Sequence, residues 1–224
     1  MQHFFADPSC VDGEQIRLAG SDVNHMKNVL RMKPGEEVWI SDGEGMDYFC
    51  KVEGYEEKEA VLRVVKKEVS QTELASRLIL FQGLPKGEKM EWIVQKATEL
   101  GVWALWPVEM TRCVARGGKD SRRDRLSRIA LEAAKQSGRA HVPQIEPAQA
   151  FRQALEALKK DPPDLLLTAW EEERALPMSR AIADFAAHHG RPGRVAVVIG
   201  PEGGIAAEEW EALRALGAVS VTLG

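Results

Sequence analysis

The spacing of apolar positions changes once along the chain, close to residue 70. Upstream of this point, apolar residues come in short runs separated by turn sequences, a pattern typical of strands. Downstream, short continuous apolar runs alternate with segments that are apolar at i, i+3, i+4 and i+7, the repeat of an amphipathic helix. The polar, charged segment 66–76 separates the two patterns. We therefore expect two domains, residues 1–70 and residues 71–224.

The first domain is predicted to be rich in β-strands. Turn residues such as Lys33-Pro34-Gly35 separate its apolar runs. The runs that we expect to be strands are residues 14–18, 37–40, 48–52 and 60–65. One helix interrupts them after Ser21, which is a good N-cap residue. This spacing fits a small Greek-key or PUA-like barrel, a module that more often recognises a ligand than performs catalysis.

The second domain is predicted to alternate strands with helices. Its first helix, residues 90–100, is apolar along one face and ends at Gly101, where a helix-ending glycine belongs. Further helices are expected at residues 122–137, 148–159, 178–188 and 207–216, and strands at residues 78–81, 104–108, 165–168, 195–199 and 219–223. This alternation is typical of an α/β fold in which helices cover both faces of a parallel sheet.

The run 195–199 and the turn that follows it form the most distinctive stretch. Five successive apolar residues indicate a strand buried on both faces. The Gly-Pro-x-Gly composition of residues 200–203 suits an ordinary tight turn, but such a turn does not need the acid Glu202. Ligands of parallel α/β sheets bind at the carboxyl ends of strands, so the turn is also a candidate ligand site. It lacks the residues of a P-loop and the spacing of a dinucleotide loop, which argues against a nucleoside triphosphate or NAD.

Length and composition exclude several classes of protein. The chain has 224 residues, of which 44% are hydrophobic and 29% charged, as in an ordinary globular protein. The sequence contains no apolar run of about 18 residues, so no membrane span is predicted, and the first residues lack the pattern of a signal peptide. Cys10, Cys50 and Cys113 lie far apart, which argues for a cytoplasmic protein without zinc or disulfides. We therefore expect neither a metal nor a membrane as a partner.

The net charge of −4 hides an uneven distribution of charge. Residues 110–140 carry nine Lys or Arg and three Asp or Glu, a net charge of +6. A basic face on an otherwise acidic protein suits contact with the phosphates of a nucleic acid. A solvated basic helix is the alternative explanation.

Four blocks of the sequence resemble one family of enzymes. They are residues 86–92 with 95–101, residues 132–139 with Val142-Pro143, residues 199–204 with Glu208-Glu209, and residues 29–32 with Pro34-Gly35 and Asp42-Gly43. Over nearly the whole chain, their order and spacing resemble the RsmE family of 16S ribosomal RNA (uracil-N3)-methyltransferases, of the SPOUT superfamily. The resemblance implies a PUA-like N-terminal domain that recognises RNA and a C-terminal α/β domain with a trefoil knot. It also implies a homodimer, S-adenosyl-L-methionine as cofactor, and a uridine of 16S rRNA or the 30S subunit as substrate.

In the family that the chain resembles, the cofactor lies in loops at the ends of the last three strands. The matching residues are Leu167, Thr168, Ala169, Ile199, Gly200, Glu202, Gly203, Gly204, Leu223 and Gly224. The family continues after this point with an Arg-rich segment and a final helix, which complete the knot, part of the adenosine pocket and the dimer interface. We expect the intact protein, with this segment, to be an active enzyme.

Methylation of uracil at N3 requires the loss of a weakly acidic imide proton from a base that is flipped out of its stack. Either Arg139 or Lys86 is expected to stabilise the anion that develops on a carbonyl oxygen. Glu202 is expected to act as the base if burial raises its pKa, or otherwise to orient the cofactor or hold the turn. Candidate contacts to RNA phosphates are Arg31, Arg112, Arg116 and Arg139. The alternative function is that of a non-catalytic RNA-binding protein with a degenerate cofactor crevice.

Overall fold

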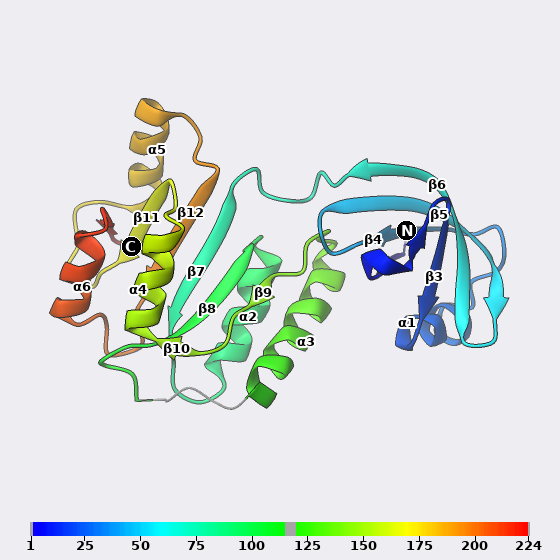
Figure 1. Cartoon of the computed structure of the whole chain (residues 1–224), viewed down its shortest axis with the longest axis horizontal. Helices are drawn as coiled ribbons and strands as arrows, with labels where there is room; N and C mark the ends of the chain where they lie inside the picture. Colours follow the sequence, from blue (N-terminus) through cyan, green and yellow to red (C-terminus); the bar gives the residue numbers. More distant parts are fainter. Residues whose placement is uncertain (1, 115–119, 224) are drawn as a thin grey trace. The chain divides into compact units, whose positions relative to one another are not determined.

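The computed structural model describes residues 2–114 and 120–223, which fold as two compact units (Figure 1). The N-terminal unit comprises Met1–Glu73 together with Ala134–Val142. The C-terminal unit comprises Leu74–Ala133 together with Pro143–Gly224. The division therefore falls within the polar segment 66–76, and a short later segment groups with the first unit.

Six strands form the sheet of the N-terminal unit among the described residues, in the order β1-β4-β5-β6-β3-β2. They are β1 (His3–Phe5), β2 (Val11–Asp12), β3 (Gln15–Ala19), β4 (Glu37–Ser41), β5 (Met46–Glu56) and β6 (Glu59–Val69), with a 3-10 turn η1 (Pro8–Cys10) before β2. The β1–β4 pair is parallel and the other neighbours are antiparallel. Register shifts in the long β5–β6 hairpin bend the sheet around the buried side chains of Ile16, Ile40 and Leu62. The four predicted strands are confirmed as β3, β4, β5 and β6.

The helix expected after Ser21 is present but begins differently. Helix α1 (Ser21–Asn24) starts at Ser21 itself and continues into a π-helical turn, η2 (His25–Val29). Gly20 precedes it with a φ of 79°, a conformation that glycine adopts without steric penalty. The assignment of Ser21 as the N-cap is therefore wrong by one position. Met26 is fully buried and fastens this helical segment to the core of the sheet.

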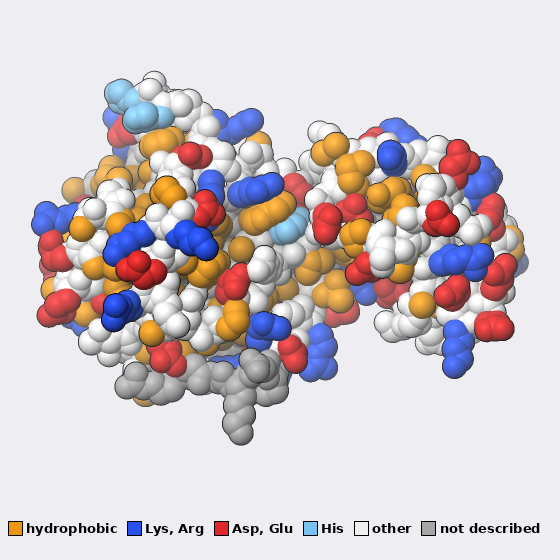
Figure 2. Space-filling view, viewed as in Figure 1, with side chains coloured by type: hydrophobic (Ala, Val, Ile, Leu, Met, Phe, Trp, Pro, Cys, Tyr) orange, Lys and Arg blue, Asp and Glu red, His pale blue; other side chains and the backbone are white. Residues whose placement is uncertain are grey.

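On the face drawn in Figure 2, acidic and basic side chains are interspersed over both units. Within the C-terminal unit, Arg125 is paired with Glu91 at 2.8 Å. Within the N-terminal unit, Lys135 is paired with Asp22 at 2.9 Å. The excess positive charge of residues 110–140 is thus partly neutralised by acids from other segments.

The sheet of the C-terminal unit is parallel throughout the described residues. Its order is β10-β8-β7-β12-β11-β13, and β9 also pairs with β8. The strands are β7 (Arg77–Gly83), β8 (Ala104–Glu109), β9 (Gln144–Ile145), β10 (Gln149–Ala150), β11 (Leu165–Ala169), β12 (Arg194–Ile199) and β13 (Val219–Val221). The distinctive run 195–199 is therefore a central strand, as its unbroken apolar character predicts.

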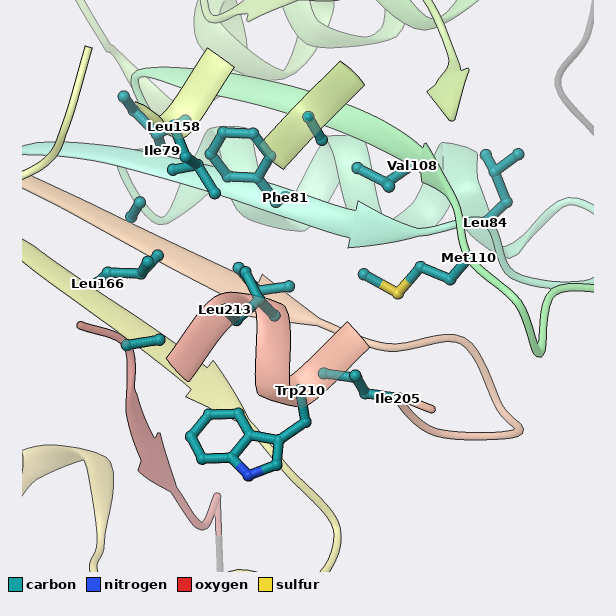
Figure 3. Close-up of a cluster of buried hydrophobic side chains, with 14 of the residues drawn as sticks. Ile79, Phe81, Leu84, Val108, Met110, Leu158, Leu166, Ile205, Trp210 and Leu213 are labelled. Atoms are coloured by element: carbon teal, nitrogen blue, oxygen red, sulfur yellow. The ribbon is translucent and has the colours of Figure 1, made fainter. Parts of the chain in front are cut away.

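Helices cover both faces of this sheet, which confirms the predicted α/β arrangement. The helices are α2 (Lys89–Glu99), α3 (Asp120–Ser137), α4 (Phe151–Lys160), α5 (Met178–His189) and α6 (Ala207–Arg214). Leu213 and Trp210 of α6 pack with Leu166 in one core cluster (Figure 3), whereas Ala181 of α5 packs with Leu167 in another. Successive residues of a strand point to opposite faces, so Leu166 and Leu167 contact different helical layers.

One helix of this unit begins three residues later than predicted. The helix expected at residues 148–159 begins only at Phe151, because Gln149 and Ala150 pair with Val108 and Glu109 of β8 as strand β10.

The sequence predicts no membrane span and no metal site. Within residues 2–114 and 120–223, no helix combines the length and apolar character that crossing a bilayer requires. The same residues contain no group of three His, Cys, Asp or Glu side chains placed to hold a metal ion.

Candidate cofactor pocket and active site

A pocket of about 460 Å³ opens at the carboxyl ends of β11, β12 and β13, which are neighbours in the C-terminal sheet. Three segments line it: residues 169–171 with Glu173, residues 199–204, and residues 221–223. Parallel strands present their carboxyl ends at one edge of the sheet, and ligands of such folds bind there. The volume lies within the range of sites that hold a small molecule or cofactor.

Close packing of the backbone explains the glycines in the turn after β12. A Cβ atom on Gly200 would lie 2.8 Å from Cγ1 of Ile205 and 2.9 Å from the carbonyl carbon of Gly204. A Cβ atom on Gly83, at the end of the neighbouring strand β7, would lie 2.6 Å from the backbone nitrogen of Pro201. Neither approach is sterically allowed, so the turn is more constrained than an ordinary strand-to-helix connection.

Glu202 holds this turn to the loop after β7. Its carboxylate accepts the backbone N–H of Lys86 at 3.2 Å and the ammonium of Lys89 at 2.7 Å. The hydrogen bond from Lys89, followed by backbone donors, lowers the pKa of Glu202 to about 2. A carboxylate with this pKa is a weak proton acceptor at neutral pH. The condition for Glu202 to act as a base, a pKa raised by burial, is therefore not met, and the geometry supports its role in holding the turn.

Arg112, from the loop after β8, connects the turn to the loop after β11. Its Nη1 donates to the carbonyl oxygen of Gly203 and to Oε1 of Glu171, both at 3.0 Å. The other carboxylate oxygen of Glu171 accepts the backbone N–H of Ile205 at 3.2 Å. Two loops that are distant in the sequence are thus joined to the turn at the rim of the pocket.

Glu209 connects the loop after β8 to the start of α6 through hydrogen bonds of its buried carboxylate. It lies in the first turn of α6 and is only 6% exposed. Its Oε1 accepts the backbone N–H and the hydroxyl of Thr111 at 2.8 and 3.1 Å, and its Oε2 accepts the N–H of Ala206 at 3.1 Å. A buried carboxylate satisfied by three donors fixes the loop after β8 against the start of α6.

Glu173 contributes a third fixed carboxylate to the pocket wall, after Glu202 and Glu171. It accepts the backbone N–H groups of Ala175 and Leu176 at 2.8 and 3.1 Å and the hydroxyl of Ser220 at 2.8 Å. The hydrogen bond from Ala175, and then that from Ser220, lowers the pKa of Glu173. This side chain therefore keeps its negative charge in the pocket at neutral pH.

An aromatic side chain supplies the apolar part of the wall. Trp170 lines the pocket, and its ring stacks on that of Trp210 with centroids 4.9 Å apart and planes inclined by 22°. Ile199, Val221 and Leu223 add further apolar surface. The pocket thus combines a flat aromatic and aliphatic wall with three anchored carboxylates, those of Glu171, Glu173 and Glu202.

Two family models match the chain. Residues 72–224 match the model described as RNA methyltransferase domain, and residues 18–65 match the model described as RNA methyltransferase PUA domain. The chain is 30% identical to Ribosomal RNA small subunit methyltransferase E of Bacillus subtilis, over 100% of this chain and 89% of that protein. The chain belongs to the ribosomal RNA small subunit methyltransferase E family.

Other members of the methyltransferase E family extend this result. The Mycobacterium tuberculosis protein is 31% identical over 99% of this chain and 83% of its own length. The crystal structure of the Neisseria gonorrhoeae enzyme bound to S-adenosyl methionine matches with a TM-score of 0.81 at 29% identity, covering 100% of this chain and 89% of that one. The predicted methyltransferase fold and PUA-like domain are confirmed, and a non-catalytic RNA-binding protein is not favoured. The trefoil knot stays a prediction.

The residues predicted to bind the cofactor fall into three groups. Those that line the pocket are Ala169, Ile199, Gly200, Glu202, Gly203, Gly204 and Leu223. Leu167 and Thr168 are instead fully buried within β11 and are not part of the lining. Gly224 lies outside the described residues. The pocket begins where β11 ends, at Ala169.

Several pocket residues were missed by the sequence reasoning. They are Trp170, Glu171, Glu173, Pro201, Val221 and Thr222. Each is in or within a few residues of the end of a predicted strand, so the rule that ligands bind at carboxyl ends was the signal that could have found them. What that rule does not supply is the side-chain partner, such as Arg112 for Glu171.

Arg139 differs most from its expected role. Its guanidinium, with the side chain only 4% exposed, forms an ion pair with Glu73. The other oxygen of Glu73 accepts the backbone N–H groups of Ala140 and His141 at 2.9 and 3.0 Å. The charge of Arg139 is therefore buried and compensated within the N-terminal unit, and the predicted contact with RNA phosphates stays a prediction. Its catalytic role stays a prediction, which requires this ion pair to open.

The other candidate basic residues are in different situations. Arg31 is exposed in the N-terminal unit and has a φ of 55°. Arg112 is half-exposed, but its guanidinium is engaged at the rim of the pocket. Arg116 lies outside the described residues. Lys86 is exposed, and its backbone N–H is bound to Glu202.

Proposed function

We propose that this chain is an S-adenosyl-L-methionine-dependent methyltransferase that acts on small-subunit ribosomal RNA and methylates N3 of one uridine. The observation that carries the proposal is the pocket at the ends of β11, β12 and β13, built around the glycine turn that contains Glu202. The chain belongs to the methyltransferase E family, and a relative of the same fold is bound to S-adenosyl methionine. Family membership and the pocket therefore point to the same chemistry.

The residues of the pocket suit a cofactor that combines a cation with an aromatic base. The ionised carboxylate of Glu173 attracts a positive charge, and the partly exposed surface of Trp170 offers a flat apolar contact. Ile199 and Leu223 extend the apolar surface. When bound, the cofactor supplies an electrophilic methyl group. The chain's own part is to hold the acceptor base in line with that group and to keep water away from it.

The chain must also stabilise the negative charge that develops on uracil as N3 loses its proton. We assign this task to Lys86, whose backbone is fixed to the pocket turn through Glu202 and whose side chain is exposed. A cation aimed at a carbonyl oxygen of uracil lowers the energy of the anion. Arg139 is the second candidate and acts only if its ion pair with Glu73 opens.

We further propose that the N-terminal unit recognises the RNA. Arg31 is the exposed basic residue that we assign to a phosphate contact there. The substrate is a uridine of 16S rRNA, presented alone or in the 30S subunit, and the protein acts in the cytoplasm as a homodimer. Light scattering of the purified protein tests the dimer, and parallel reactions with free 16S rRNA and with 30S subunits identify the form of the substrate.

A methyl-transfer assay tests the function directly. The purified protein is incubated with S-adenosyl-L-methionine and with 30S subunits or 16S rRNA that lack the modification, and the RNA is digested and mapped. We expect N3-methyluridine at a single position, and no product when the cofactor is omitted. No methylated nucleoside from either substrate would refute the proposal. Methylation of another atom or base would preserve the methyltransferase and overturn its assignment to uracil N3.

A further inference from the structure

The turn after β12 is held at its outer side by two charged residues from different loops. Arg112 reaches the carbonyl oxygen of Gly203, and Glu171 reaches the amide of Ile205. We infer that Arg112 and Glu171 together form a clasp that positions this turn for cofactor binding. The inference rests on the proposed function, and it assigns to Arg112 a positioning role in place of the phosphate contact expected from its charge.

The hydrogen bonds of the clasp form a closed path around Gly204. Nη1 of Arg112 is 3.0 Å from both Gly203 O and Glu171 Oε1. Glu171 uses its other oxygen, Oε2, to accept the N–H of Ile205 at 3.2 Å. The peptide groups on both sides of Gly204 are therefore fixed by side chains that are bound to each other. A change in either side chain frees one peptide group directly and removes the ion pair that supports the contact to the other.

The two glycines of the turn are shaped to this clasp. A Cβ atom on Gly203 would lie 3.0 Å from Cβ of Arg112, and one on Gly204 would lie 1.9 Å from Oε1 of Glu171. The absence of side chains at both positions lets the clasp touch the backbone directly. Gly204 also has a φ of 75°, which glycine tolerates and other residues rarely adopt.

The electrostatics of the pocket support a positioning role for Arg112. Glu171 and Glu173 both line the pocket, but the ion pair at 3.0 Å compensates the charge of Glu171. Glu173 is held by neutral backbone and hydroxyl donors, so it keeps its negative charge for a cationic ligand. An RNA phosphate that bound Nη1 of Arg112 would have to displace both Glu171 and the carbonyl oxygen of Gly203. This nitrogen is therefore used in the pocket wall.

Variants of the clasp, each with a matched control, test the inference. Arg112→Ala and the isosteric Glu171→Gln each remove one half of the clasp, and Arg112→Lys keeps the charge. Arg180→Ala removes a comparable exposed arginine, which pairs with Asp184 at 2.8 Å on α5. For each protein, calorimetry measures the Kd for S-adenosyl-L-methionine, filter binding without cofactor measures RNA affinity, and steady-state kinetics give KM for each substrate.

We expect Arg112→Ala and Glu171→Gln to raise the cofactor Kd and KM by roughly three- to thirtyfold, the range for a charge-assisted hydrogen bond that is partly exposed. RNA affinity and KM for RNA stay within the error of the wild type. Arg112→Lys recovers part of the loss, because an ammonium pairs with Glu171 but lacks the planar fork of the guanidinium. The double variant binds the cofactor no more weakly than the single variant with the higher Kd, since both substitutions break the same chain of hydrogen bonds. Arg180→Ala behaves as the wild type.

Two outcomes would overturn the clasp. One is weaker RNA binding by Arg112→Ala with an unchanged cofactor Kd, which would restore the phosphate contact. The other is an unchanged cofactor Kd for both single variants. If the wild type itself binds no cofactor, the proposed function fails instead. The clasp is then judged by hydrogen exchange of residues 203–206, which must speed up in Glu171→Gln and not in Arg180→Ala.

Discussion

Replacing Gly204 with alanine is expected to disable the cofactor pocket while the fold persists. Gly204 has a φ of 75°, and an added Cβ atom would lie 1.9 Å from Oε1 and 2.4 Å from Cδ of Glu171. Two atoms cannot occupy that space, so the carboxylate of Glu171 must move away. Its hydrogen bonds to Arg112 and to the amide of Ile205 are then lost.

The size of the effect follows from two costs. A left-handed backbone costs alanine about 1 kcal/mol relative to glycine. The hydrogen bonds that Glu171 loses are charge-assisted but half-exposed, and together they contribute roughly 1 kcal/mol. The variant turn relaxes away from the binding geometry, and cofactor binding has to restore it. A total of about 2 kcal/mol corresponds to a rise in Kd of roughly thirtyfold.

Gly217→Ala is the matched control for this experiment. Gly217 follows α6 and has a φ of 83°, but a Cβ atom there would meet nothing within 4 Å. It therefore carries the backbone cost without the collision with Glu171. Calorimetry with S-adenosyl-L-methionine and thermal unfolding are measured on both variants. Equal losses of affinity in the two variants, or wild-type affinity in Gly204→Ala, would refute the reasoning.

Three further predictions concern the other charged contacts. Glu202→Gln keeps an acceptor for the N–H of Lys86 but loses the charge that binds Lys89, so the rate of single-turnover methyl transfer should fall by less than about tenfold. A fall in this rate of more than about a hundredfold, with normal cofactor affinity, would reinstate Glu202 as the base. Arg139→Met leaves the carboxylate of Glu73 without its partner in a site that is largely shielded from water, so the free energy of unfolding in urea should fall by about 3 kcal/mol. The double variant with Glu73→Gln should recover part of this loss. An unchanged midpoint of urea unfolding would show that the ion pair has no structural role. Folding lowers the pKa of Glu202 from 4.5 to about 2. The ionised carboxylate therefore contributes stability that is complete above pH 4.5 and is lost as the pH falls towards 2. Over this range the melting temperature should decline less steeply in Glu202→Gln than in the wild type, and parallel pH profiles would contradict the assignment.

The main elements of the fold follow from local patterns in the sequence. Strand β12 and the glycine turn after it are encoded by neighbouring residues, because an apolar run and a set of glycines act within a few positions of each other. The same holds for helix α2, whose apolar face repeats at helical spacing and which ends before Gly101. These elements depend only on the spacing of residue types along the sequence, and the ends of the predicted strands also indicated the edge of the sheet where the pocket lies.

Very short strands were beyond this kind of prediction. Strand β10 consists of Gln149 and Ala150, and it exists only because β8 offers it a pairing edge. The same pairing moved the start of helix α4 to Phe151. Two residues carry no periodicity, so nothing in the local sequence distinguishes such a strand from the first turn of the helix.

The partners within the site come from folding at long range. Arg112 and Glu171 are 59 positions apart, and Arg139 and Glu73 are 66 positions apart. Charge alone made Arg112 and Arg139 equally good candidates for RNA contacts. The order β8-β7-β12-β11-β13 brings the loops after β8 and β11 to the turn after β12, and this gives Arg112 its carboxylate and its carbonyl. Amino-acid types reveal which charges are present, whereas the order of strands in the sheet sets which charges meet, because pairing joins segments that are not neighbours along the chain.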